Sequence, residues 1–270
     1  MGFSTSAGIG RKSQIGMIAW GSKDPTLPMP NIRFYDAETK QTSYQVNPGS
    51  TGQARVDGML RRLSVTPVES YNDREKNTGL KSEWRMFLTL DGGEAEDLAV
   101  LGMTFLDEGL ATVDQRSLQL INSLHSLMEL MQKGQENGGI DRETPIQIGL
   151  YSAPGNNGQV YPRSIIRLPS GYDENGVAQF NDPKNFVRSE SLPPAGVPVE
   201  VNGKPVMANG MPVRDYTAAL EWANEKVTAL VDFFGKKDGE QETEGESAAD
   251  LAGAAAAADE VAQQRPRMTA

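Results

Sequence analysis

Arginine and aromatic side chains alternate with apolar ones in the stretch 83–90, EWRMFLTL. Successive side chains of a strand point to opposite faces, so Met86 and Leu88 share one face while Arg85 and Phe87 share the other. A guanidinium group neutralises phosphate, and an aromatic ring stacks on an exposed nucleobase. The chemistry available to this second face is therefore binding of a phosphate-linked chain of bases, with no bond made or broken.

The same pairing of residue types returns in two later stretches, 145–151 and 160–168. If Ile146, Ile148 and Leu150 point inward, alternation turns Tyr151 outward. In the second stretch Tyr161, Arg163, Ile165 and Arg167 share one side of the strand by the same parity. We expect this side to face the ligand.

Further basic and aromatic residues lie before residue 83. The long run 54–70 contains Gly58 and Pro67, which predict a bent and partly exposed strand. Arg61 and Arg62 lie on it, and alternation allows only one of them to face a ligand. The polar loop 71–82 that follows contributes Tyr71, Arg74, Lys76 and Lys81.

Residues suited to catalysis or metal binding are scarce. The chain has no cysteine and one histidine, His125, which excludes disulfides, thiolate metal sites and multi-histidine sites. His125 lies within a predicted helix, no serine has an evident triad partner, and the paired carboxylates have no companion histidine. The turn SAPGNNGQ lacks the Gly-Lys-Ser/Thr of a phosphate-binding loop. We therefore predict no catalytic residue, no metal site and no cofactor, and hence a protein that is not an enzyme.

The net charge of −10 is unevenly distributed along the chain. Acids outnumber bases by eleven to three in 91–143 and by eight to two in 238–270, whereas 145–168 contains no acid. Net charge governs solubility and non-specific attraction, so it does not exclude a local cationic face. No apolar run reaches the roughly 18 residues of a membrane span, and the first residues lack a signal peptide's apolar centre. These features predict a cytoplasmic protein that does not bind membranes.

The predicted elements divide the chain into four parts. Residues 1–53 form an N-terminal segment that packs on the barrel, with a short strand at 15–20 and a hairpin at 31–46. Residues 54–168 contain strands at 54–70, 83–90, 94–101, 145–151 and 160–168, and a helix at 114–133 between Asp114 as N-cap and Gly134 as terminator. Residues 169–235 contain a hairpin at 199–206 turning on Asn202-Gly203 and a helix at 216–234. Residues 236–270 read as a disordered acidic and alanine-rich tail, and no internal repeat is evident.

The order of three strands, a helix and two strands in 54–168 is that of the OB-fold. This fold is a five-stranded β-barrel, here with a helix between its third and fourth strands. The stretches that carry the likeness are EWRMFLTL, DGGEAEDLAVLG, SLQLINSLHSLM and IQIGLYSAPGNNGQVYPRSIIRL. In them the chain resembles the single-stranded DNA-binding proteins of tailed bacteriophages. Two features depart from that family: the large flanking segments 1–53 and 169–235, and the ending RPRMTA, where bacterial members of the class often have an acidic tip with a terminal aromatic.

The resemblance implies a sequence-independent single-stranded DNA-binding protein of phage-type replication or recombination, which coats and protects the strand in the host cytoplasm. In an OB-fold the ligand lies on strands 2 and 3 and the loops joining strands 1–2 and 4–5. The implied DNA-binding residues are Arg61, Arg62, Tyr71, Arg74, Lys76, Lys81, Arg85, Phe87, Tyr151, Tyr161, Arg163 and Arg167. Replication proteins meeting the acidic tail, and self-association, are the expected further partners. The alternative is a viral structural or adaptor protein whose barrel contacts protein.

Overall fold

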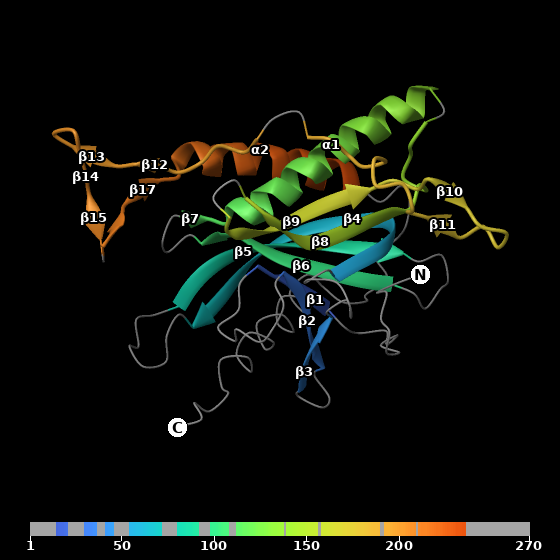
Figure 1. Cartoon of the computed structure of the whole chain (residues 1–270), viewed down its shortest axis with the longest axis horizontal. Coiled ribbons are helices and arrows are strands. Elements are labelled where there is room, and N and C mark those ends of the chain that lie inside the picture. The colour runs from blue at the N-terminus through green and yellow to red at the C-terminus, as the bar shows by residue number, and fades with distance from the viewer. Residues whose placement is uncertain are drawn as a thin grey trace.

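The computed structural model describes residues 15–20, 30–36, 41–45, 54–71, 80–91, 98–107, 112–137, 139–155, 158–189, 192–208 and 210–235. These residues are mainly β structure with two helices (Figure 1). The strands of the large sheet are β1 (Ile15–Ala19), β2 (Asn31–Asp36), β3 (Gln41–Gln45), β4 (Ala54–Tyr71), β5 (Leu80–Asp91), β6 (Leu98–Asp107), β7 (Thr112–Val113), β8 (Ile146–Pro154) and β9 (Val160–Arg167). The helices are α1 (Gln115–Asn137) and α2 (Thr217–Phe234).

The nine strands form one curled sheet in the order β3-β2-β1-β6-β5-β4-β8-β9, with β7 paired to β6. All neighbours are antiparallel except β1 and β6, which are parallel. β4 joins the two halves, because its residues 54–58 pair with β8 and its residues 59–71 pair with β5. Gly58 lies at this change of partner with φ +153°, and a Cβ there would meet the Asp91 carbonyl oxygen at 2.9 Å. A glycine is therefore required at the bend.

One face of the sheet, the inner face, packs on both helices and contains the core. Val56, Leu60, Met86, Leu88 and Leu90 are completely buried there, together with Ile148 and Ile166 from the other half of the sheet. The stripe of α1 that includes Leu118, Ile121, Leu124, Met128 and Met131 is buried against them. α1 packs on β6 and β9, and α2 packs on α1 and β4. The predicted apolar parity of residues 83–90 and 145–151 is confirmed.

The start of α1 is fixed by side chains from distant parts of the chain. Asp114 Oδ1 accepts hydrogen bonds from the backbone N–H groups of Arg116 (2.9 Å) and Ser117 (3.2 Å), which confirms the predicted N-cap. The buried Ser117 hydroxyl accepts from Trp20 Nε1 at 2.9 Å and donates to the Thr104 carbonyl at 2.8 Å. One hydroxyl thus connects α1 to β6 and to the end of β1.

Two predicted boundaries are wrong. The strand predicted at 94–101 corresponds to β6, which runs past its predicted end to Asp107, and its predicted start at residue 94 lies outside the described residues. Gly134 does not end α1, which runs on to Asn137. A Cβ on Gly134 would collide with the backbone of Ile140, so the glycine allows the returning chain to cross the helix closely.

The segment after β9 contains only short ladders. These are β10 (Gly171–Tyr172) with β11 (Ala178–Gln179), β12 (Val197–Pro198) with β17 (Arg214–Asp215), β13 (Glu200–Val201) with β14 (Lys204–Pro205), and β15 (Met207–Ala208) with β16 (Met211–Pro212). The predicted hairpin on Asn202-Gly203 corresponds to β13–β14. In the part of the chain that the structure describes, no helix is long and apolar enough to cross a lipid bilayer.

Candidate nucleic-acid interface

The face of the sheet opposite the core, the outer face, carries most of the predicted binding residues that the structure describes. Residues directly opposite each other in an antiparallel pair share a face. Arg55, Gly149 and Ile165 form one such row, and Asp57, Gln147 and Arg167 form the next. Tyr151 lies opposite Arg163, and Ala153 lies opposite Tyr161. The predicted common side for Tyr151, Tyr161, Arg163 and Arg167 is confirmed.

We call the group Arg55, Tyr151, Tyr161, Arg163 and Arg167 the cationic wall. Arg55 is exposed and was not among the predicted residues. It could have been found from the bend at Gly58, which pairs residues 54–58 with β8. The described residues of the wall's three strand segments, 54–58, 146–154 and 160–167, contain three arginines and one acid, Asp57. The wall therefore carries positive charge in a chain whose net charge is negative.

A small pocket of about 120 Å³ opens in the cationic wall. It is lined by Ala54, Arg55, Gln147, Gly149, Leu150, Tyr151, Ile165 and Arg167. Gly149 leaves the space at its floor, where an added Cβ would come within 3.1 Å of Ile165 Cγ2. The pocket places a half-buried tyrosine ring and two guanidinium groups around one depression, an arrangement suited to a base or a phosphate.

Polar contacts hold the arginines of the wall in place. Arg167 Nη1 donates to Gln147 Oε1 at 3.5 Å, and Gln147 Nε2 donates to Asp57 Oδ1 at 3.0 Å. Burial raises the pKa of the Asp57 carboxyl, and the hydrogen bond from Gln147 offsets part of that effect. Among the described residues, Arg167 Nε has no hydrogen-bond partner. That atom is itself buried, so a donor of Arg167 that reaches a phosphate oxygen would have to come from the terminal Nη groups.

Arg163 and Tyr161 lie at the end of β9 that adjoins the β8–β9 loop. The Arg163 guanidinium carbon is 5.9 Å from the centre of the Tyr161 ring, and Arg163 Nη1 donates to Gln119 Oε1 at 3.3 Å. The ring of Tyr161 is one-third exposed (36%) and its hydroxyl donates to Gln159 at 2.9 Å. An aromatic ring and a cation thus lie side by side at this end of the wall, with Arg163 also bonded to α1.

The predicted ligand-facing exposure of Arg85 and Phe87 is wrong. Both point to the outer face, as the alternation predicts, but their exposed fractions are 0% and 1%. Phe87 lies opposite Gly102, which also pairs with Met17 of β1, and a Cβ on Gly102 would contact both side chains. Met17 of β1, which extends the sheet beyond β6, therefore packs beside Phe87 on the outer face, and among the described residues the exposed side chains of this face lie on β4 and β9.

Arg61 and Arg62 are both exposed, whereas alternation predicted one. The register of β4 against β5 shifts between Leu60 and Arg62, so Arg61 is the extra residue of a β-bulge. The bulge keeps Leu60 and Leu63 on the inner face and leaves both arginines between them outside.

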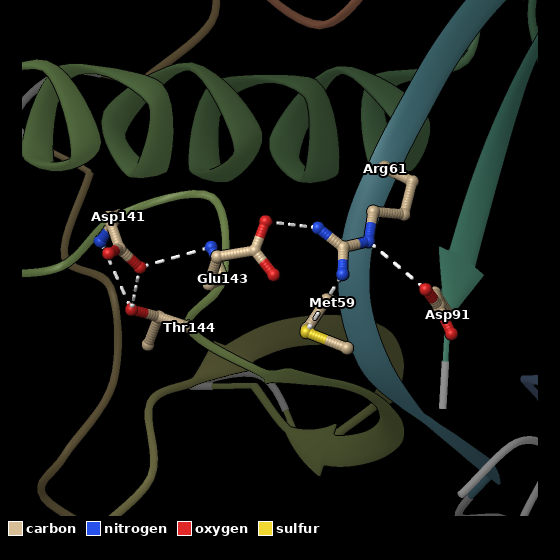
Figure 2. A network of polar contacts seen from close by, with 6 residues as sticks. All are labelled: Met59, Arg61, Asp91, Asp141, Glu143 and Thr144. Carbon is tan, nitrogen blue, oxygen red and sulfur yellow. Dashed lines mark hydrogen bonds and ion pairs between the residues drawn. The ribbon is translucent and has the colours of Figure 1, made fainter. Parts of the chain in front are cut away.

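The guanidinium of Arg61 is occupied by two carboxylates (Figure 2). Arg61 Nε donates to Asp91 Oδ2 at 3.1 Å, and Nη1 pairs with Glu143, whose hydrogen bond raises the pKa of Arg61. Asp141 accepts hydrogen bonds from the Glu143 N–H and the Thr144 hydroxyl, which orients the turn that presents Glu143. Arg61 therefore joins β4 to β5 and to this turn instead of presenting a free cation.

The remaining predicted residues lie at or beyond the limit of the described chain. Arg74 and Lys76 are outside the described residues, and the side chains of Tyr71 and Lys81 are outside them as well. Their assignment to the interface stays a prediction.

Residues of catalytic type do not gather within the described ranges. His125 Nδ1 lies 3.4 Å from Glu129 Oε1 on the same helix, and burial lowers the pKa of its imidazole. No group of three His, Asp or Glu side chains in the described part of the chain is arranged to share a metal ion.

Comparison with known proteins gives no relative. No protein-family model, no curated protein and no solved structure matches the chain significantly.

Proposed function

We propose that this protein binds single-stranded DNA without sequence preference, through the cationic wall of β4, β8 and β9. The observation that carries the proposal is that two tyrosines and three arginines project from one face of three adjacent strands. Arginines that neutralise phosphates bind any sequence, and so do rings that stack on bases. The function in the cell would be that of a phage-type replication or recombination protein, which coats and protects the unpaired strand.

The arrangement of the strands supports an OB-like core in this proposal. β4, β5 and β6 are consecutive antiparallel neighbours, and β8 and β9 continue from the opposite edge of β4. α1 follows β6 in the chain and packs on both β6 and β9, the two strands that would meet in a closed barrel. An OB-fold is a partly open five-stranded barrel that binds its ligand on its second and third strands and on the loop between its fourth and fifth strands. The cationic wall lies instead on the counterparts of the first, fourth and fifth strands, so it shares only that loop with the usual OB-fold site. The equivalent loop here joins β8 to β9, next to Tyr161.

Binding only the unpaired form of DNA also gives the protein a physical means of removing hairpins. A protein that binds one state of an equilibrium shifts that equilibrium toward it by mass action. Each stacked base contributes about 1–3 kcal/mol, and three neutralised phosphates predict a log–log salt slope of about −2 for a single strand. The proposed wall thus predicts moderate affinity with a clear dependence on salt.

A fluorescence anisotropy titration with a labelled oligo(dT) tests the proposal. We expect Tyr151→Ala to weaken binding roughly 5- to 140-fold, the equivalent of about 1–3 kcal/mol. Arg167→Ala should weaken binding and reduce the salt slope by about 0.7. Lys133→Ala is the matched control. Lys133 is exposed on α1, so this substitution also removes one positive charge but at a position away from the wall. Equal affinities for all four proteins would refute this interface.

A viral structural or adaptor protein is the second candidate function. It is favoured by one observation: exposed apolar side chains are concentrated in residues 197–213, which lie apart from the cationic wall. The same titration separates the two functions, since an adaptor would not bind oligo(dT) even at low salt.

A further inference from the structure

Residues 197–215 form an arm that projects from the body of the molecule (Figure 1). Three short ladders, β12–β17, β13–β14 and β15–β16, meet at three valines. Val199 N donates to Val213 O (2.9 Å), Val206 N donates to Val199 O (2.8 Å), and Val213 N donates to Val206 O (2.8 Å). These bonds close a ring, so the arm is a three-way junction with approximate threefold symmetry.

The sequence of the arm repeats with the same symmetry. The pattern Pro-Val-x-x-Asn-Gly-x occupies 198–204 and 205–211, and Pro-Val returns at 212–213. Asn202, Gly203 and Gly210 have φ values of +54°, +70° and +78°, as tight hairpin turns require. The expectation of a chain without internal repeats is therefore wrong. The repeat unit is only seven residues long, and only the hairpin on Asn202-Gly203 was predicted from the sequence.

None of the described residues of the arm is buried. The large apolar side chains exposed on it are Val197 (62%), Val201 (60%), Met207 (54%), Met211 (70%) and Val213 (36%). Two-stranded ladders of this length are at best marginally stable in water by themselves. Exposed apolar groups clustered on a projecting element mark a surface that is covered when it functions.

We infer that the arm docks on the arm of a second copy of this chain. The two acids of the arm, Glu200 and Asp215, balance its two bases, Lys204 and Arg214. Asp215 accepts from Thr217 and Arg214 donates to the Gly196 carbonyl at the base of the arm, whereas Glu200 and Lys204 lie on one hairpin as a self-complementary pair for a second arm. The whole chain carries −10, so two bodies repel each other, whereas two neutral arms do not. Because the arm projects, it brings two copies together while their bodies stay apart.

The size of the arm also fits this partner. One side of a standard protein–protein interface contributes roughly 20–30 residues, and the arm from 197 to 215 supplies most of such a side. A pair of identical arms related by a twofold axis would bury the valine and methionine side chains of both copies in one contact. The self-association expected from the sequence thus acquires a specific surface.

Sedimentation velocity of the full-length protein over a wide concentration range tests the inference. We expect the wild type to change from monomer to dimer, and Met207→Glu combined with Met211→Glu to self-associate at least tenfold more weakly. Tyr172→Glu is the matched control, because Tyr172 is equally exposed (59%) on the β10–β11 hairpin outside the arm. A wild type that stays monomeric, or an arm variant that dimerises as the wild type does, would overturn the inference.

A charge-swap pair distinguishes arm-to-arm contact from docking elsewhere on the second copy. Lys204→Glu and Glu200→Lys should each weaken self-association, and an equimolar mixture of the two variants should restore it. Failure of the mixture to exceed the separate variants would overturn arm-to-arm docking. No nucleic acid is present in these experiments, so their failure would leave the proposed DNA binding untouched.

Discussion

Because Phe87 is buried, we expect its replacement to lower the stability of the fold instead of the affinity for DNA. Alternation with core residues had predicted that Phe87 contacts the ligand. The ring is 1% exposed and lies over Gly102 beside Met17. Replacing a buried Phe by Ala removes the transfer free energy of the ring and leaves a cavity, which together cost about 3–5 kcal/mol.

A loss of this size is large beside the total stability of a domain, which is about 5–15 kcal/mol. Urea denaturation followed by tryptophan fluorescence measures it, because Trp20 is buried and Trp84 and Trp222 are half-buried in the same molecule. At about 2 kcal/mol per molar urea, Phe87→Ala should lower the midpoint by roughly 1.5–2.5 M. Residual binding of oligo(dT) by the folded fraction should be unchanged.

Tyr151→Ala is the matched comparison, because the ring of Tyr151 is only half-buried and lines the open pocket. It should lower affinity while its urea midpoint changes less than that of Phe87→Ala. A Phe87→Ala protein that lost less than about 1 kcal/mol of stability and bound DNA more weakly would contradict the placement of Phe87 in the packed interior.

Three other substitutions give distinct expectations. Gly134→Ala should destabilise the protein by about 1–3 kcal/mol although alanine favours helices, because the added methyl would meet the backbone of Ile140; a higher Tm would contradict this. Burial raises the pKa of Asp57 in the folded state. The protonated carboxyl therefore stabilises the fold below the ordinary pKa of about 3.9, and this stabilisation is lost as the pH rises through the folded-state pKa. Asp57→Asn should therefore raise Tm at pH 7 but not at pH 3.5, and a lower Tm at pH 7 would contradict the assignment. Arg61→Ala should lower the free energy of unfolding in urea by less than about 1 kcal/mol, because the ion pairs of Arg61 are exposed. It should also leave the oligo(dT) affinity within twofold. A large loss of affinity would show that Arg61 contacts the DNA.

Local patterning predicted the elements whose partners are close in the chain. The strands around Ile148 and Ile166 and the helix around Ile121 have strong period-2 or 3.6 patterns, and their inward faces were assigned correctly. Tyr151, Tyr161, Arg163 and Arg167 could be placed on one side for the same reason. Alternation is a property of a single strand and needs no knowledge of the fold.

Features set by distant contacts could not be predicted in the same way. Phe87 is buried because β1, some seventy residues earlier in the chain, pairs with β6 and brings Met17 over Gly102. Arg61 and Arg62 are both exposed because a bulge interrupts the alternation of side chains, and no pattern in the local sequence predicts this bulge. Arg55 joins the cationic wall only because β4 changes partner at Gly58. In each case alternation along the strand determines which face a side chain lies on, but not which other residues cover that face.

The closed ring of backbone hydrogen bonds in the arm has a consequence for how the arm opens. Each valine donates to one valine of the ring and accepts from the other, so displacing any one valine breaks two of the three bonds. Opening of the junction is therefore a single cooperative event, and the amides of Val199, Val206 and Val213 should exchange with solvent deuterium at one common rate.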